Sequence, residues 1–327
     1  MSNTLPKLSI ITINYNNTRG LEKTLSSVWN DQTYSNFEHI VIDGGSTDGS
    51  VNVIKKYADK LTYWVSEPDK GIYNAMNKGI LKAKGEYLLF LNSGDWLCSD
   101  SIKDIFKTEF NQDIISGNYI VIKENGKTSV MESPQEISMP QLMLHSLGHP
   151  ATLIKRELLI ENPYHEEYKI ISDWAFWIEE LIIKNRTYHK ISVNISNYDF
   201  TGISSLEKNK KIINKETKEF LIKTFGPLGA ATMIFQMLTQ SFFWASIFFA
   251  STAVFKTTKG YGDRFIMSAI FVAVLSFQNT HLSDLAMIIA GENLLIATII
   301  AMVVKVMLGI GACLVTKYYL DNKYILQ

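Results

Sequence analysis

Short apolar runs alternate with helix-length amphipathic segments in the first part of the chain, up to about residue 225. Four runs have the length of a β-strand and are bounded by Asn, Asp, Gly or Pro: Leu8–Ile13, Phe37–Ile42, Leu61–Val65 and Tyr87–Leu91. Helical patterns lie between them, at residues 18–29 (with Leu21, Leu25 and Val28 on one face) and at residues 47–58 (with Val51, Ile54 and Ala58). This order predicts an α/β domain with a doubly wound sheet, in which ligands bind beyond the carboxyl ends of the strands.

The rest of the chain is dominated by long apolar stretches. No charged residue occurs from Leu228 to Phe255, and a helix needs roughly 20 apolar residues to cross a membrane, so this run predicts a membrane span. Residues 294–315 are also long enough, with Lys305 as their only charge, whereas the run Phe265–Phe277 is short. We therefore expect two or three membrane spans, or more. A large buried helical domain is the alternative.

The change in composition near Gly226-Pro227 divides the chain into an expected catalytic domain at 1–225 and a membrane-associated helical region at 226–327. The segment 207–223 before the boundary is basic, as in juxtamembrane segments that contact anionic lipid on the cytoplasmic side. A solvated helix is the alternative. The N-terminal sequence lacks the pattern of a secretory signal, so we expect the first domain to face the cytoplasm.

Composition excludes several classes of function. Lys and Arg number 32, as do Asp and Glu, and this zero net charge does not favour binding to nucleic acid. The two cysteines, Cys98 and Cys313, have no CxxC spacing, which argues against a disulfide framework and a zinc site.

Polar residues follow three of the predicted strands. Asp43 begins a Gly-rich turn, where its carboxylate can accept a hydrogen bond from a base, although Thr47 or Asp48 could simply cap the next helix. Lys70 precedes a predicted helix whose N-terminus suits phosphate groups. Asn92 and Asp95 flank a tight turn in which Mg²⁺ or Mn²⁺ could be held together with phosphate oxygens.

Four segments together resemble the family 2 glycosyltransferases of GT-A type, especially bacterial enzymes of colanic-acid, O-antigen and exopolysaccharide synthesis. They are SIITINYNN at 9–17, VIDGGSTDGS at 41–50, SEPDKGIYNAMNKGI at 66–80 and FLNSGDW at 90–96, and the resemblance extends from residue 8 to about 206. It implies a GT-A nucleotide-sugar-binding domain with a doubly wound mixed sheet, followed here by a C-terminal helical transmembrane region.

The resemblance also implies roles for individual residues. Tyr15 and Asp43 would hold the base of the donor, and the ribose and phosphates would be bordered by Asp69, Lys70 and Asn77. The family's DxD metal motif falls on Ser93-Gly94-Asp95. Asp95 matches the metal-binding carboxylate, for Mn²⁺ or Mg²⁺, whereas Ser93 replaces the first carboxylate and is assigned to donor binding.

On the acceptor side, Gly148-His149-Pro150 and the segment 168–174 resemble the second half of these enzymes. Asp173 matches the catalytic base, and His149 and Trp174 would line the acceptor site. Alternatively, Ser172 or Asp173 only caps the helix that follows. The segment Phe200–Ser205 resembles the family's late GGxSS-type segment.

The expected function is inverting, metal-dependent transfer of a single sugar from a UDP-linked donor in bacterial surface polysaccharide synthesis. The acceptor would be a lipid-linked saccharide or a polyprenyl phosphate, reached by an enzyme attached to membrane lipid at the bacterial inner membrane, with its catalytic domain facing the cytoplasm. The alternatives are a polyprenyl-phosphate glycosyltransferase and a catalytically degenerate scaffold subunit. A sugar nucleotidyltransferase would need a Gly-rich loop where Asn14–Asn17 stands, and a processive synthase would need a Q-x-x-R-W segment, which this sequence lacks.

Overall fold

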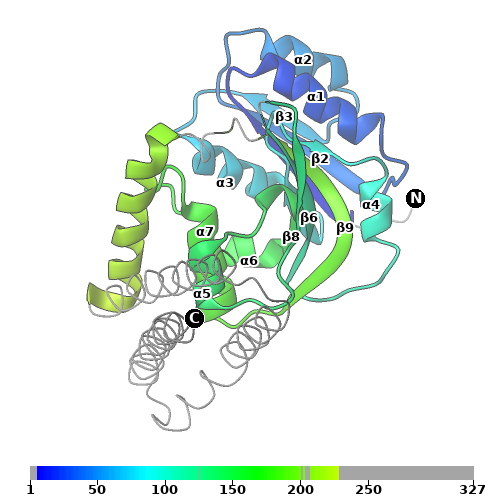
Figure 1. The fold of residues 1–327 in the computed structure, drawn as a ribbon. Helices are drawn as coiled ribbons and strands as arrows, with labels where there is room; N and C mark the ends of the chain where they lie inside the picture. The colour runs from blue at the N-terminus through cyan, green and yellow to red at the C-terminus, as the bar shows by residue number, and fades with distance from the viewer. Residues whose placement is uncertain (1–5, 124, 200–201, 203–206, 228–327) are drawn as a thin grey trace, which may run out of the picture. The chain divides into compact units, whose positions relative to one another are not determined.

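The computed structural model describes residues 6–123, 125–199, 202 and 207–227 (Figure 1). The chain divides into two compact units, Met1–Phe220 and Leu221–Gln327. The expected membrane region and Lys305 lie outside the described residues, as does most of the segment Phe200–Ser205. Within the described ranges, no helix has the length and apolarity needed to cross a membrane.

The described residues of the first unit form a nine-stranded mixed sheet with the order β3-β2-β1-β4-β8-β6-β9-β5, and β7 pairs with β6. Four parallel strands make one half of this sheet. They are β1 (Leu8–Asn14), β2 (Phe37–Asp43), β3 (Tyr63–Ser66) and β4 (Tyr87–Phe90). All four lie where the apolar runs predicted strands, within two residues at each end.

The other half of the sheet begins with β8 (Thr152–Lys155), which is antiparallel to β4. It continues through β6 (Ile114–Ile122), with β7 (Thr128–Met131) on one side of it and the long β9 (Tyr188–Asp199) on the other. The last pairs of β9 join it to the short β5 (Trp96–Leu97), where Asn197 lies opposite Trp96. This pairing brings the end of β9 to the turn that follows β4.

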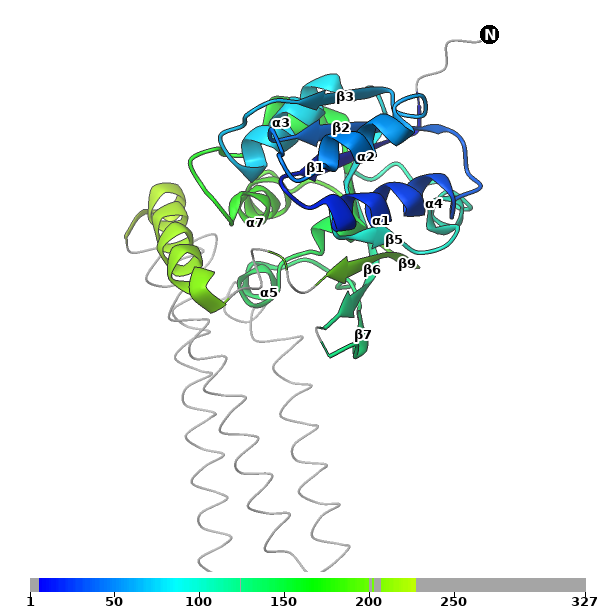
Figure 2. The same ribbon diagram turned by 90° about the horizontal axis from the view of Figure 1, so that it is seen from above.

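Helices cover both faces of the sheet, as a doubly wound fold requires (Figures 1 and 2). One face carries α1 (Thr18–Trp29), α2 (Ser50–Tyr57) and α4 (Ser101–Ile105). The other carries α3 (Ile72–Lys82), α6 (Arg156–Glu161) and α7 (Ser172–Trp177), which continues as the π-helix η2 (Ile178–Ile183). The remaining described helical segments are α5 (Met139–Leu144), the 3₁₀ turns η1 (His149–Ala151) and η4 (Glu207–Asn209), and a helix at residues 210–227.

The two helices predicted from periodicity differ in how closely they match. In α1, Leu21, Leu25 and Val28 are buried as expected. The prediction for residues 47–58 was wrong at its start, because α2 begins at Ser50 and buries Val53 and Ile54. The Asp48 carboxylate accepts hydrogen bonds from Ser50 N and Oγ, at 3.1 and 2.6 Å, which holds the preceding residues in a turn.

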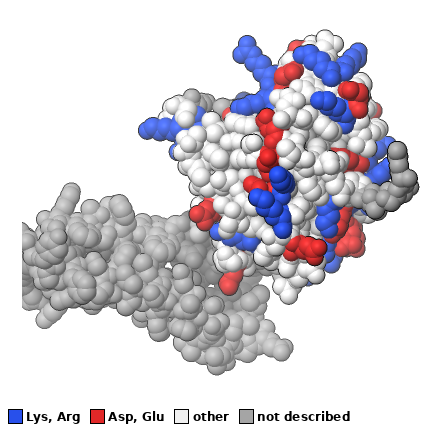
Figure 3. Space-filling model, turned by 90° about the vertical axis from the view of Figure 1, so that its right-hand side faces the viewer, with Lys and Arg blue, Asp and Glu red and all other residues white. Residues whose placement is uncertain are grey.

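Basic and acidic side chains are interspersed over the face of the domain shown in Figure 3. Neither sign of charge forms a continuous area there. The face therefore offers no single-sign field that would steer a highly charged polymer.

Helix α3 packs closely on the parallel strands at Gly79. A Cβ atom at this position would lie 2.5 Å from Ile11 Cγ2 in β1 and 3.6 Å from Ile42 Cγ1 in β2. Only glycine allows this approach, and the approach sets the height of α3 above the sheet.

We expect Gly79→Ala to lower the free energy of unfolding by about 1–2 kcal/mol, because the clash with Ile11 exceeds the gain in helix propensity. The matched control is Leu81→Ala on the same helix, where the side chain is 74% exposed and the change should stay within about 0.5 kcal/mol. Urea unfolding of both variants measures the difference. An unchanged midpoint for Gly79→Ala would show that α3 can move away from β1 without cost.

Candidate active site

The carboxyl ends of the four parallel strands lie along one edge of the sheet, and the predicted donor-side residues follow them. Asn14 ends β1, Asp43 ends β2 and Ser66 ends β3, in adjacent register. The turn at 92–95 follows β4. The sequence placed these segments at one edge by the rule for parallel sheets, and the structure brings them together there.

Asp43 is the centre of a hydrogen-bond cluster at this edge. Its side chain is fully buried and accepts four hydrogen bonds: from Asn14 Nδ2 (2.7 Å), Ser46 Oγ (2.6 Å), Ser46 N (2.9 Å) and Ser66 Oγ (2.6 Å). Burial alone would raise the pKa of this carboxyl, but the hydrogen bonds from Ser46, Ser66 and Asn14 together lower it. Asp43 is therefore an ionised acceptor that ties together the ends of three strands, and a base could approach it only by replacing one of these donors.

Tyr15, Gly44 and Asp69 meet in front of this cluster. Tyr15 is a large aromatic residue that is 67% exposed. A Cβ atom on Gly44 would lie 2.5 Å from Asp69 Oδ2 and 3.2 Å from Tyr15 Cδ2. The absence of a side chain at Gly44 thus leaves room for an exposed ring and a carboxylate to lie side by side, an arrangement suited to a nucleoside.

The N-terminus of α3 comes next to this group. Asp69 Oδ1 accepts a hydrogen bond from Gly71 N at 2.9 Å, and Gly71, with φ +121°, turns the chain into the helix. No side chain caps the helix at Gly71, and the Lys70 side chain is exposed. Free N–H groups and a neighbouring lysine at a helix start favour a phosphate.

Asn77, predicted to border the ribose or phosphates, has another set of partners in the structure. Its Nδ2 donates to Tyr164 O (2.8 Å) and Glu166 Oε1 (3.1 Å), and its Oδ1 accepts from Tyr164 N (3.0 Å). Asn74 Nδ2 donates to the other oxygen of Glu166 at 2.9 Å. The amide of Asn77 is fully used in holding the loop at 162–167 against α3.

The turn after β4 presents one buried carboxylate. Asp95 is 7% exposed, and its Oδ1 accepts a hydrogen bond from Asp199 N, at the end of β9, at 3.0 Å. Burial raises the pKa of the Asp95 carboxyl to about 7; the hydrogen bond opposes this shift, and the charge of Asp199 adds to it. Ser93, in the same turn, accepts a hydrogen bond from Asn17 Nδ2 through its backbone oxygen at 3.0 Å.

These residues fit a hard divalent cation in part. No group of three or more His, Cys, Asp or Glu side chains in the described part of the chain is arranged to hold a metal ion. Asp95 and Asp199 nevertheless place two carboxyl groups close enough to repel, and the buried Asn92 Oδ1 has no partner among the described residues. A Mg²⁺ or Mn²⁺ ion bound there would complete its coordination with phosphate oxygens and water.

Asp173 lies beside the first turn of α3. Tyr73, in the first turn of α3, contacts Asp173 Oδ1 at 2.8 Å and Ile170 O at 2.6 Å through its hydroxyl. Burial, together with the charge of Asp173, raises the pKa of Tyr73 well above its ordinary value, so the phenol remains protonated. Capping of α7 by Ser172 or Asp173 is not seen: the N-cap is Ile171 and has no side-chain hydrogen bond.

The other two residues predicted to line the acceptor site, His149 and Trp174, contact other parts of the protein. The His149 ring stacks on Phe90, with centroids 4.8 Å apart, and its Nε2 lies 2.8 Å from Tyr164 Oη. Burial lowers the pKa of His149, against the opposing charge of Asp173. Trp174 Nε1 donates to Leu142 O at 2.7 Å. In this structure both residues pack within the protein near Asp173.

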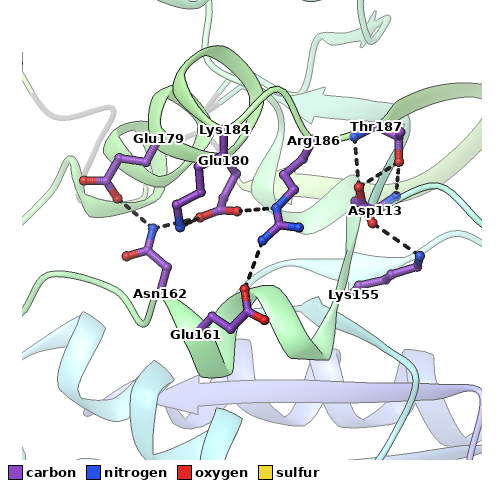
Figure 4. A network of polar contacts seen from close by, with 9 residues as sticks. All are labelled: Asp113, Lys155, Glu161, Asn162, Glu179, Glu180, Lys184, Arg186 and Thr187. Carbon is purple, nitrogen blue, oxygen red and sulfur yellow. Dashed lines mark hydrogen bonds and ion pairs between the residues drawn. The ribbon is translucent and has the colours of Figure 1, made fainter.

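A second polar network holds the loop at 162–167 against η2 (Figure 4). Asn162 Nδ2 donates to both Glu179 Oε2 (2.8 Å) and Glu180 Oε1 (2.9 Å), and the buried Glu180 is paired with Lys184 and Arg186. The π-helical geometry of η2 lets the two consecutive glutamates face the same amide. The loop that carries Tyr164 and Glu166 is thus held on two sides.

Sequence reasoning missed several residues that the structure places at the site. They are Tyr73, Tyr164, Glu166 and Asp199. Tyr73 lies inside the recognised segment 66–80, so its position in the first helical turn was an available signal. The others depend on contacts between segments far apart in the chain, which no local pattern reveals.

Comparison with known proteins identifies the family of one part of the chain. Residues 9–159 match the family model for glycosyl transferase family 2. An uncharacterised glycosyltransferase of Mycobacterium tuberculosis is 47% identical over 90 residues, which are 28% of this chain and 34% of that protein, so the match spans about a third of its length. One of Rickettsia typhi is 27% identical over 249 residues, 68% of this chain and 76% of that protein.

The fold also matches solved structures. The crystal structure of S. aureus TarS 1-349 in complex with UDP-GlcNAc superimposes with a TM-score of 0.53 and 18% identity, over 91% of this chain and 89% of that one. At this identity the likeness concerns the fold alone, and it shows a GT-A-like α/β domain. Residues 9–159 thus carry a glycosyl transferase family 2 domain, and the chain is similar to bacterial glycosyltransferases.

Proposed function

We propose that this chain transfers a single sugar from a nucleotide-sugar donor to an acceptor hydroxyl, with inversion at the anomeric carbon. The observation that carries the proposal is the hydrogen bond between Tyr73 and Asp173. It joins the candidate base to the helix whose N-terminus suits the donor's phosphates, so both reactants would be held by one element.

Different residues of the site would bind the base and the diphosphate of the donor. The exposed Tyr15 ring would stack on the base, beside Gly44 and Asp69. Lys70 and the first turn of α3 would face the diphosphate. A UDP-linked donor is supported by the UDP-GlcNAc complex of the TarS structure, which shares the fold.

In the reaction, the acceptor oxygen forms a bond to the anomeric carbon while the bond from that carbon to the diphosphate oxygen breaks. The hydroxyl proton passes to Asp173, which the Tyr73 hydroxyl holds in place at Oδ1. The nucleoside diphosphate leaves with the bonding electron pair. A Mn²⁺ or Mg²⁺ ion held by Asp95 and Asp199 would supply positive charge for this leaving group.

A general base distinguishes between the two expected kinds of acceptor. A hydroxyl must lose its proton as it attacks, whereas a polyprenyl phosphate is already ionised at neutral pH and needs no base. The position of Asp173 therefore favours a hydroxyl of a lipid-linked saccharide over a lipid phosphate.

Membrane attachment is part of the proposal. It is supported by the uncharged run Leu228–Phe255 and by the basic segment before it, both read from the sequence. We place the enzyme at the bacterial inner membrane, with residues 1–225 on the cytoplasmic side and the helical region at 226–327 in the membrane. Surface polysaccharide synthesis is the proposed setting.

We expect Asp173→Asn to lower the turnover number by about 10²- to 10⁴-fold, because an amide cannot accept the acceptor's proton. The dissociation constant for UDP should stay unchanged. A sugar-transfer assay on the purified full chain gives the turnover number, and calorimetry gives the dissociation constant for UDP. Asp59→Asn removes an exposed carboxylate after α2 and is the control. Normal turnover of Asp173→Asn would contradict the assignment of Asp173 as the general base.

Stacking on Tyr15 is tested by removing and then restoring the ring. We expect Tyr15→Ala to weaken UDP binding roughly tenfold, since stacking on a base is worth about 1–3 kcal/mol, and Tyr15→Phe to bind within about twofold of the wild type. Because the side chain is 67% exposed, neither change should move the melting temperature. Equal affinities for the Ala and Phe variants would place the base elsewhere.

Binding of Mn²⁺ should depend on pH through Asp95. The carboxyl, with a pKa of about 7, must lose its proton to bind the ion, so the apparent affinity should fall as pH is lowered through 7, by up to about tenfold per pH unit. Electron paramagnetic resonance titration with Mn²⁺ alone measures this. Asp104→Asn, which breaks the exposed ion pair between Asp104 and Lys107, is the control. Affinity that stays constant from about pH 8 to about pH 6 contradicts the assignment.

A further inference from the structure

Glu216 is a buried carboxylate outside the donor-side cluster. It lies in the helix at 210–227 and is 6% exposed. Its Oε1 accepts a hydrogen bond from Lys169 N at 2.8 Å, and its Oε2 accepts one from Ile170 N at 3.1 Å. The side chain thus binds two consecutive backbone N–H groups, one with each oxygen.

The backbone that Glu216 holds leads directly into the candidate base. Ile170 donates its N–H to Glu216 and accepts a hydrogen bond from Tyr73 at its carbonyl oxygen, so this residue is held at both backbone groups. Tyr73 also contacts Asp173 at 2.8 Å. Ile170 O and Asp173 Oδ1 share the single hydroxyl proton of Tyr73, so a short series of polar contacts runs from Glu216 through Ile170 and Tyr73 to Asp173.

Phe220 supports the same segment one helical turn further on. Its side chain is 2% exposed and packs against Tyr168 and Trp174, with ring centroids 6.2 and 5.6 Å apart. Tyr168 and Trp174 stand on the two sides of the segment 169–173. The helix at 210–227 therefore holds this segment by a carboxylate and an aromatic ring spaced four residues apart.

Packing alone gives no reason for a carboxylate at this position. Burial of a charge costs free energy unless the charge is paired or hydrogen-bonded, and Glu216 forms no ion pair within the described residues. Its two hydrogen bonds to N–H groups are charge-assisted and directional, and they offset this cost. Such bonds specify the position of a loop backbone more closely than apolar contact does.

We propose that Glu216 is a positioning residue for the transfer reaction: it fixes the backbone at 169–170 and, through Ile170 and Tyr73, the orientation of Asp173 toward the acceptor. The inference rests on the proposed role of Asp173 as the base. Glu216 itself touches neither donor nor acceptor.

The test is Glu216→Gln in the full chain, which keeps the shape of the side chain but turns one acceptor into a donor facing an N–H group. The turnover number for sugar transfer should fall about tenfold, while the dissociation constant for UDP stays within about twofold. Hydrogen exchange should become faster in peptides that cover residues 165–172. Glu219→Gln, an exposed change on the same helix, is the matched control and should leave all three unchanged.

A double-variant comparison separates positioning from a general loss of structure. In the Asp173→Asn background, Glu216→Gln should cause no further loss of the residual rate, because the group through which it acts is gone. Phe220→Leu, a second change to the same support, should lower turnover with UDP affinity preserved if Glu216→Gln does not fold.

Wild-type turnover of a folded Glu216→Gln variant would overturn the inference and leave the base assignment intact, provided that Asp173→Asn is inactive. An equal loss of rate in both backgrounds would also overturn it. Normal turnover of Asp173→Asn would instead remove the base assignment and the inference together, and a wild-type chain that transfers no sugar would remove the proposed function.

Discussion

The donor side of this domain depends on one buried charge. Asp43 accepts four hydrogen bonds, and its donors come from the ends of β1 and β3 and from the turn after β2. Without these donors a buried carboxylate would be costly, so the three loops are held at the positions where their donors reach it. Because Tyr15 follows Asn14 and the loop to Asp69 follows Ser66, the geometry of the candidate nucleoside site is fixed by Asp43, whether or not the base itself contacts this carboxylate.

Helix α3 connects the candidate donor side to the candidate acceptor side. Its N-terminus lies beside Asp69, and its first turn carries Tyr73 against Asp173. Asn74 and Asn77, both half-buried, hold the loop at 162–167 against the helix. Gly79 sets its distance from the sheet. A reaction between two bound molecules needs their reacting atoms at a fixed separation, and a single rigid helix that contacts both sides supplies that separation.

The sequence predicted what local patterns encode. The four parallel strands follow from apolar runs, and the order of the loops follows from the rule that parallel strands end at one edge. The start of α2 was missed because Asp48 holds a turn where periodicity extended the helix. Contacts such as Asp95 with Asp199, Tyr73 with Asp173, and Glu216 with Ile170 join residues 46 to 104 positions apart. The pairing of β5 with β9, which produces the first of them, has no local signal.

The turn after β4 shows how the fold can compensate for a departure from the family pattern. Ser93 stands where the resemblance expects a first carboxylate, so the turn itself offers only Asp95. The pairing of β9 with β5 then brings Asp199 to that turn from the other end of the domain. The charge of Asp199 raises the pKa of the buried Asp95 carboxyl, and a divalent cation or a proton relieves that repulsion. The second carboxylate of this candidate metal site is thus supplied by tertiary structure, through a strand that ends where the loop begins.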